Sequence, residues 1–341
     1  MKVLTLRRWA VTQLVLAGLL ALSIFVGLMA GTADIRPSEV LDVLTGRSAD
    51  PMAKLIVLKV RLPRILLAVL VGGALSVAGV TFQALLRNPL ADPFILGISG
   101  GAAFGAVTAI TLGLDFVLLG ISTIPIFSFA GAIATMFLIY SVSRAHGRIP
   151  VFTLLLVGVI FNAFFSAIIM FITSIVDFTN VLKIVFWLMG NLTTVQYRDI
   201  AVTAVYVFAG LGFLLPMAAR LNLLSLGEEA AHQLGTDVER TKRISFFAAS
   251  LVTAAAVSAA GMIGFVGLMV PHIVRLALGP DHRLVLPASA LFGAAFLVAA
   301  DTVARTLIAP TEIPVGVITA ICGGPFFIWL LKTRQRRIGY E

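Results

Sequence analysis

One polar segment, residues 220–243, carries the side chains best suited to cap helices and to contact a partner protein. It reads RLNLLSLGEEAAHQLGTDVERTKR and lies between two long apolar runs. Ser225 and Glu228 have the spacing of a helix capping box, and the letters TDVE repeat that spacing. Gly235, between the two boxes, is the residue type that commonly follows a helix end. We therefore expect two short capped helices joined at a glycine, which would form a compact knob outside the apolar part of the protein. The second of them can run on into the next span.

The first of these helices would carry an apolar face. Leu226, Ala230 and Leu234 recur at i, i+4 and i+8 and so share one side of a helix. A small helix of this kind can seat in a cleft of a partner protein. The alternative is a solvated loop, against which the two capping boxes argue. The polar residues expected to point away from the apolar face are Glu228, Glu229, His232 and Gln233.

The sequence does not favour a catalytic function. No GxxxxGK[ST] occurs, so the chain lacks a P-loop and cannot hydrolyse ATP by that route. The letters GISGG (97–101) fit the GxSxG pattern but lie within an apolar run, and no Cys–His arrangement indicates a nucleophile. The lone Cys322 excludes an internal disulfide. We expect neither an enzyme nor a metal site, because the histidines lack metal-ligand spacing. These histidines are His146, His232, His272 and His282.

The composition indicates an all-α polytopic membrane protein. The chain is 60% hydrophobic and 12% charged, with a mean hydropathy of +1.06, whereas about a quarter of the residues in soluble domains are charged. Its apolar runs are about twenty residues long, enough to cross a ~30 Å hydrocarbon core. The net charge of +9 comes from Lys and Arg scattered among the loops, a pattern that reflects membrane orientation more often than nucleic-acid binding.

We expect about ten spans in a single transmembrane permease domain, residues 1–341. A polar outer loop with a short surface helix, residues 31–60, follows the first span, and the letters KIVFWLM are too short to cross. The long uncharged run 244–271 should divide near Gly261 and Gly264. The expected spans are 10–30, 62–86, two within 94–142, 151–176, 200–219, two within 244–271, 288–307 and 315–331.

The positive-inside rule favours both termini in the cytoplasm, since the inner segments then carry most of the 25 Lys and Arg. One group violates the rule, because Lys54, Lys59, Arg61 and Arg64 crowd the outer end of the second span. These side chains could anchor the helix at the lipid interface. Alternatively, they could form a docking surface for an acidic partner outside.

The spans contain almost no Asp or Glu. An ion-driven transporter usually keeps such a residue within its spans, but here Asp301 is the one acid near a span interior, and it can pair with Arg305 one turn later. The sequence therefore indicates either a passive channel or a transport pathway that receives its energy from a partner.

Several long motifs in a fixed order resemble the FecCD-type permeases, the membrane subunits of ATP-binding-cassette (ABC) importers for ferric siderophores, haem and vitamin B12. The resemblance covers nearly the whole chain. The motifs are VRLPR (60–64), AGVTFQALLRNPLADPFILGISGGA (78–102), LMGN (188–191), LNLLSLGEEAAHQLG (221–235), GMIGFVGLMVPHIVRLALGPDHR (261–283), DTVAR (301–305) and EIPVGVITAICGGPFFIWLL (312–331).

The resemblance implies ten spans with cytoplasmic termini in the bacterial inner membrane. It also implies a homodimer with one path at its interface, two cytoplasmic ATPase subunits that use ATP and Mg, and an external substrate-binding protein. This chain itself would bind no cofactor. The implied roles are coupling to the ATPase for Gly227, Glu228, Ala231, Leu234 and Gly235, docking of the binding protein for Arg61, Arg64 and Arg305, and a cytoplasmic gate at Asn88, Leu90, Phe152 and Thr153.

The preferred hypothesis is thus an importer subunit that works by alternating access and carries an iron chelate, with a ferric siderophore first and haem or vitamin B12 as alternatives. The competing hypotheses are an ion-coupled secondary transporter and a passive channel or scaffold.

Overall fold

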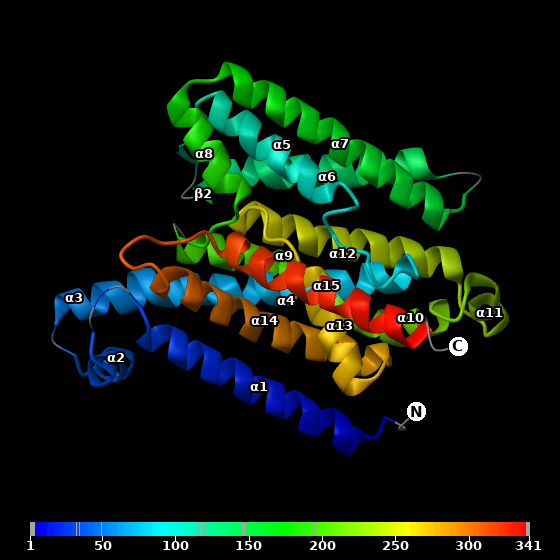
Figure 1. Ribbon diagram of the computed structural model, residues 1–341, viewed down its shortest axis with the longest axis horizontal. Coiled ribbons are helices and arrows are strands. Elements are labelled where there is room, and N and C mark those ends of the chain that lie inside the picture. Colours follow the sequence, from blue (N-terminus) through cyan, green and yellow to red (C-terminus); the bar gives the residue numbers. More distant parts are fainter. Residues whose placement is uncertain are drawn as a thin grey trace.

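The structure is a computed structural model that describes residues 4–31, 33, 35–48, 50–114, 116–118, 121–144, 147–193 and 196–338. Helices dominate the described part of the chain, and most of the long ones run along the longest axis of the molecule (Figure 1). The strands found there are β1 (Val117–Leu118) and β2 (Ile121–Ser122), an antiparallel pair. The expected all-α polytopic fold is confirmed.

Seven segments of the described chain are long and apolar enough to cross a membrane. The helices that make them up are α1 (Leu6–Met29), α3 (Pro51–Lys54) continuing through the π-helical η1 (Leu55–Arg61) into α4 (Leu62–Leu85), α6 (Thr123–Ser143), α7 (Val151–Ile175), α9 (Tyr197–Leu214) continuing through η2 (Leu215–Met217) into α10 (Ala218–Leu224), α12 (Val238–Ala260) and α14 (His282–Thr306).

The other expected spans correspond to shorter apolar helices. A helix of 14 residues such as α5 (Ile98–Thr111) is only about 21 Å long, less than the hydrocarbon core. The count of ten spans therefore stays a prediction. The further helices are α2 (Pro37–Leu44), α8 (Phe178–Leu188), α11 (Glu228–Gln233), α13 (Val266–Leu278) and α15 (Val315–Ile338).

The long uncharged run divides where the sequence predicts. Helix α12 ends at Ala260, and Gly261 follows with a φ of +69°, a conformation that favours glycine. A Cβ at Gly261 would also collide with the carbonyl oxygen of Trp187 at the end of α8. Helix α13 begins after Phe265, which itself has a φ of +67°. The break between α12 and α13 is thus fixed by residues with a left-handed backbone and by close contact with the end of α8.

Helix α4 forms the centre of the fold and is buried along most of its length, with α12 and α14 packed against it. Glycines permit this close approach. A Cβ at Gly72 would collide with the backbone of Gly293 on α14, and one at Gly79 would collide with the backbone of Gly267 on α13. Small residues at such crossings let helix backbones touch, as membrane helices require for close packing.

The second span begins earlier than the sequence indicates. The predicted surface helix within residues 31–60 is present as α2, but from Pro51 onward the chain is already helical and continues into α4. Asp50 explains this start, because its carboxylate accepts a hydrogen bond from the amide of Met52 at 2.9 Å and Pro51 occupies the first helical position.

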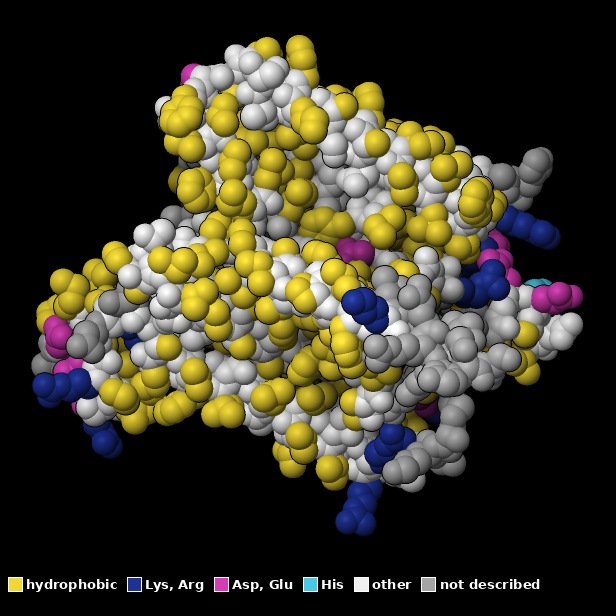
Figure 2. Space-filling model, viewed as in Figure 1, with side chains coloured by type: hydrophobic (Ala, Val, Ile, Leu, Met, Phe, Trp, Pro, Cys, Tyr) yellow, Lys and Arg dark blue, Asp and Glu magenta, His cyan; other side chains and the backbone are white. Residues whose placement is uncertain are grey.

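Charge marks the two ends of the molecule. Helices α2 and α3 lie at one end, while α11, the start of α1 and the end of α15 lie at the other (Figure 1). Hydrophobic side chains cover most of the visible flank between these ends, and most of the visible Lys, Arg, Asp and Glu lie towards the ends (Figure 2). This distribution suits a protein whose flank faces lipid.

Candidate functional site: the α11 segment, the α4–α5 loop and a buried ion network

The predicted coupling segment, residues 227–235, forms a short helix between two glycines. Gly227 precedes α11 with a φ of +118°, and Gly235 follows it with a φ of +82°. The expected glycine after the helix end is therefore confirmed. The expected capping box at Ser225 is wrong, because the Ser225 hydroxyl donates instead to the carbonyl of Leu221 at 2.8 Å, inside the preceding helix α10.

The second capping box is shifted by one residue. Asp237 caps α12 by accepting a hydrogen bond from the amide of Arg240 at 3.0 Å, whereas Thr236 is buried. Asp and Thr are both good cap residues, and the letters TD offer both at consecutive positions, so their spacing alone does not select one. The helix start itself is where the sequence predicts.

The coupling segment has an apolar exposed edge. Leu234 is 60% exposed and Leu226, just before the segment, is 67% exposed. Ala231 is instead fully buried and packs into this chain. Glu228 also turns inward, since its carboxylate lies 3.0 Å from the ammonium group of Lys242 on α12. The two leucines are thus the apolar side chains that a partner protein could reach.

The predicted inner gate residues lie on two separate elements. The side chain of Asn88 accepts a hydrogen bond from the amide of Leu90 at 2.9 Å, which closes a turn in the loop between α4 and α5. Leu90 is 44% exposed. On the first turn of α7, Phe152 is 77% exposed and Thr153 is half-buried.

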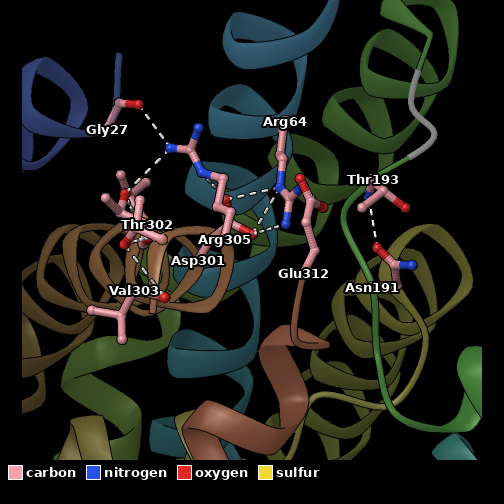
Figure 3. A network of polar contacts seen from close by, with 11 residues as sticks. Gly27, Arg64, Asn191, Thr193, Asp301, Thr302, Val303, Arg305 and Glu312 are labelled. Carbon is pink, nitrogen blue, oxygen red and sulfur yellow. Dashed lines mark hydrogen bonds and ion pairs between the residues drawn. The ribbon is translucent and has the colours of Figure 1, made fainter. Parts of the chain in front are cut away.

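Two of the predicted docking arginines, Arg64 and Arg305, form a buried ion network. Nε of Arg64 donates to both oxygens of Asp301 at 2.9 and 3.0 Å, and its Nη1 lies 2.6 Å from Glu312. Arg305 lies 3.3 Å from Asp301 through Nε, close enough for an ion pair but too poorly aligned for a hydrogen bond. In Figure 3 Asp301 lies between the two arginines, and Glu312 approaches Arg64 from the other side.

Two arginines of this end also hold the end of α1. Arg61 donates through Nη1 to the carbonyl of Leu28 at 2.7 Å, and Arg305 donates through Nη2 to the carbonyl of Gly27 at 2.7 Å. The last carbonyls of a helix lack partners within the helix, and cations near them are favourable. Arg61, Arg64 and Arg305 are only 3–4% exposed.

The sequence indicates only part of this network. The Asp301–Arg305 pair is visible as an i, i+4 spacing, and the structure confirms it. The pairing of Arg64 with Asp301 and Glu312 joins residues more than 230 positions apart, so no local pattern reveals it. Lys54 and Lys59, from the same basic group, remain exposed.

A second polar junction joins α10 to the start of α14. No local sequence pattern indicates it. The side chain of Asn222 donates to Asp281 at 2.8 Å and accepts from the amide of His282 at 2.8 Å. Asp281 also accepts hydrogen bonds from Arg283, and these bonds are the largest cause that lowers its pKa to about 2.

The described residues contain no group of three or more His, Cys, Asp and Glu able to hold a metal ion. His146 lies outside the described residues. A cavity of about 700 Å³ lies between α6, α8, α9 and α12 and includes Lys183 and Asp199 in its lining, but none of the predicted site residues borders it.

Apolar helices with charged ends define a multi-pass membrane protein, and the comparisons with known proteins place it among permeases. The FecCD transport family model matches residues 19–333, and the chain belongs to that family.

Curated relatives carry names of the same kind. The chain is 48% identical over 285 residues to the cobalamin import system permease protein BtuC of Halobacterium salinarum, covering 84% of this chain and 75% of the relative. It is 43% identical over 286 residues to the hemin transport system permease protein HmuU of Yersinia pestis, covering 83% and 85%. A metal-chelate type ABC transporter solved in an inward-facing conformation matches with a TM-score of 0.82 and 32% identity, covering 94% of this chain and 98% of that one.

Proposed function

We propose that this permease is the membrane subunit of an ATP-driven importer, and that two copies enclose one path through the inner membrane of a bacterium. Membership of the FecCD transport family is the observation that carries the proposal. The helical fold, its apolar flank and its charged ends support it (Figure 2). Because the chain contains no P-loop, ATP and Mg would be bound by two separate ATPase subunits.

The proposed cargo is a metal chelate, with a ferric siderophore placed first and haem or cobalamin as the alternatives. Names of relatives support this class, since they include cobalamin, hemin and iron(3+)-hydroxamate systems. A relative at 36% identity is named as a molybdate import permease. Permeases this similar thus carry names with different cargoes, so we assign the choice of cargo to the external binding protein.

The proposed contact with the ATPase is the coupling segment, residues 227–235. Its leucine edge is exposed at the end of the molecule that also holds the start of α1 and the end of α15 (Figure 1). Gly227 and Gly235 both have positive φ values, so they allow the chain to enter and leave the short helix sharply. Ala231 anchors this helix to the protein, and Leu234 faces outward.

The proposed docking surface for the binding protein is the opposite end, at Arg61, Arg64 and Arg305. Since these guanidinium groups already bond internal acceptors, direct pairing with an acidic partner would require them to exchange those acceptors. Lys54 and Lys59 at the same end are exposed and can meet acidic side chains without rearrangement. We therefore assign first contact to the lysines and attribute a supporting positive field to the arginines.

The proposed inner gate consists of the loop with Asn88 and Leu90 together with the start of α7 at Phe152 and Thr153. The exposed apolar side chains of Leu90 and Phe152 support this role, because two copies could bring such groups together to close a path to water. Gating would follow from displacement of α7.

Purification of the tagged chain from its own membranes tests the proposal. We expect a protein with a P-loop motif to co-purify in a 1:1 ratio with the permease, and a binding protein to be captured after cross-linking. Mass spectrometry of the ligand carried by that binding protein then identifies the cargo. Isolation of the chain without any P-loop protein, in membranes that import the cargo, would contradict the proposal.

A further inference from the structure

One buried lysine connects three elements at the α11 end of the molecule. The ammonium group of Lys242, on α12, lies 3.0 Å from the carboxylate of Glu228, the first residue of α11. It lies 2.5 Å from Glu239 on its own helix. It also donates to the backbone carbonyl of Ile149 at 2.8 Å, in the segment that precedes α7. The coupling segment and the start of α7 therefore share one cation.

In the segment before α7, both backbone polar groups of Ile149 are hydrogen-bonded to side chains of α12. While the carbonyl of Ile149 accepts from Lys242, the amide of Ile149 donates to the carboxylate of Glu239 at 2.9 Å. Pro150 follows directly as the residue before α7, and its ring fixes its φ near −66°. Phe152 and Thr153, the proposed gate residues, occupy the first turn of α7. Few backbone torsions thus separate the clamped residue from the gate.

Burial makes the connection stiff. Lys242 is 2% exposed, and its three N–H donors match the three acceptors that surround it. A charge buried this deeply is costly to leave without partners. Displacement of α11 that carried Glu228 away would leave one N–H of Lys242 without its acceptor, so the elements bonded to Lys242 resist separation.

We propose that Lys242 is a positioning residue that makes the coupling segment and the start of α7 move as one unit. A displacement of α11 by an ATPase would then reach Phe152 and Thr153 through the Glu228–Lys242–Ile149 chain, a connection independent of the apolar packing between helices. This inference rests on the proposed function, since it assumes that the coupling segment is the ATPase contact.

The test uses the complete importer, with permease, ATPase and binding protein reconstituted in vesicles, and compares three variants. Lys242→Met removes the ammonium group but retains an unbranched apolar side chain. Glu228 and Glu239 are 35% and 33% exposed, so water can solvate them in this variant. Glu228→Ala removes the acceptor that α11 offers while Lys242 keeps Glu239, and it replaces the first variant if that one does not fold. Arg243→Met is the matched control, because it removes an exposed cation from the next position.

Two measurements separate positioning from a merely structural role. The first is the amount of cargo moved per ATP hydrolysed. We expect Lys242→Met and Glu228→Ala to lower it roughly tenfold, within the ~5–150-fold range typical of coupling between sites, while ATP hydrolysis continues. The second is the distance between spin labels at Gln233 on α11 and Leu156 on α7, in a Cys322→Ser background. ATP should leave this distance unchanged in the wild type and in Arg243→Met, and should shift it in Lys242→Met.

The outcomes distinguish this inference from the proposed function. Suppose that the wild-type complex imports cargo with ATP, and that the variants at Lys242 and Glu228 keep its transport per ATP and its label distance. The role of Lys242 is then refuted while the proposed function stands. If the wild-type complex shows no ATP-dependent import at all, the proposed function fails first. Equal losses of transport in the Lys242 and Glu228 variants and in Arg243→Met would also refute the inference. Loss of any charge near α11 would then be enough to cause the effect.

Discussion

Arg64 donates from Nε to both carboxylate oxygens of Asp301, at 2.9 and 3.0 Å, although 237 positions separate the two residues. Both side chains are almost completely buried. The contact joins the start of α4 to the end of α14, the helix pair at the centre of the fold. These charges therefore hold together the end of the helix bundle at which α2 and α3 lie.

Removal of one partner of this pair should destabilise the protein. Asp301→Ala would leave Arg64 buried with Glu312 alone, and breaking a buried pair in this way typically costs ~3–5 kcal/mol. The double variant Arg64→Met with Asp301→Leu should cost less, because Arg64 is then not left as a buried charge, whereas Arg305 loses its contact with Asp301 in both variants. Unfolding in detergent measures both, with Asp42→Asn on the exposed face of α2 as control. A double variant as unstable as the single one would contradict the assigned role of the pair.

Docking of the binding protein should depend on exposed lysines more than on buried arginines. Reversal of charge with Lys54→Glu and Lys59→Glu should slow association roughly tenfold at low salt, because long-range attraction steers encounter. The difference should shrink as salt screens the charges. Stopped-flow binding measures the association rate.

Replacement of Arg61, Arg64 and Arg305 by Glu should also weaken docking, but with loss of stability, since their internal bonds would break. An unchanged association rate in the lysine variant, together with weaker docking in a folded Arg305→Met variant, would reverse this assignment.

Changes in the coupling segment should stop transport without unfolding the chain. Glu228→Arg would place a second cation beside Lys242, and Gly235→Pro cannot adopt the φ of +82° that the turn requires. We expect both variants to insert and to lose ATP-driven uptake, as measured in vesicles with circular dichroism as a control for folding. Leu234→Asp should instead lower affinity for the ATPase, because it puts a charge on the exposed leucine edge. Normal uptake in Glu228→Arg would count strongly against the coupling role.

The junction at Asp281 should give a pH-dependent contribution to stability. Its folded pKa of about 2 lies below the ordinary value of 3.8, so its contribution is present above pH 4 and is lost as the pH falls through about 2. Because the Asp281 side chain is only partly buried and its partner Arg283 is exposed, solvent screening limits the gain to below ~1 kcal/mol.

Asp281→Asn keeps a good helix cap but removes the charge. It should be slightly less stable than the wild type at pH 7 and equal to it near pH 2 in detergent unfolding curves. A constant difference across this range would show that the charge is irrelevant.

Local patterns predict much of the helical framework. The division between α12 and α13 is visible because Gly261 offers a conformation that other residues rarely adopt. The surface helix α2 is also predicted in place. The start of α3 at Asp50 is missed, because a single cap residue in a polar loop is a weak signal beside a long apolar run.

The contacts of the charged residues are less predictable. In the sequence, Lys242 is one of several cations in a polar segment. Only the fold places the carbonyl of Ile149, 93 positions earlier, beside its ammonium group. Arg64 similarly resembles a surface charge until α14 supplies Asp301. Sequence spacing reveals pairs one helical turn apart, such as Asp301 and Arg305, since those pairs need no tertiary structure.

Uptake of a metal chelate into vesicles that contain this chain, its ATPase and a loaded binding protein is the decisive test of ATP-driven import. The measurement compares ATP supplied to the ATPase side, a non-hydrolysable analogue, and an ion gradient without ATP. We predict accumulation with ATP alone, and loss of that accumulation in Glu228→Arg. Accumulation driven by an ion gradient in vesicles that lack the ATPase would contradict the claim and indicate a secondary transporter.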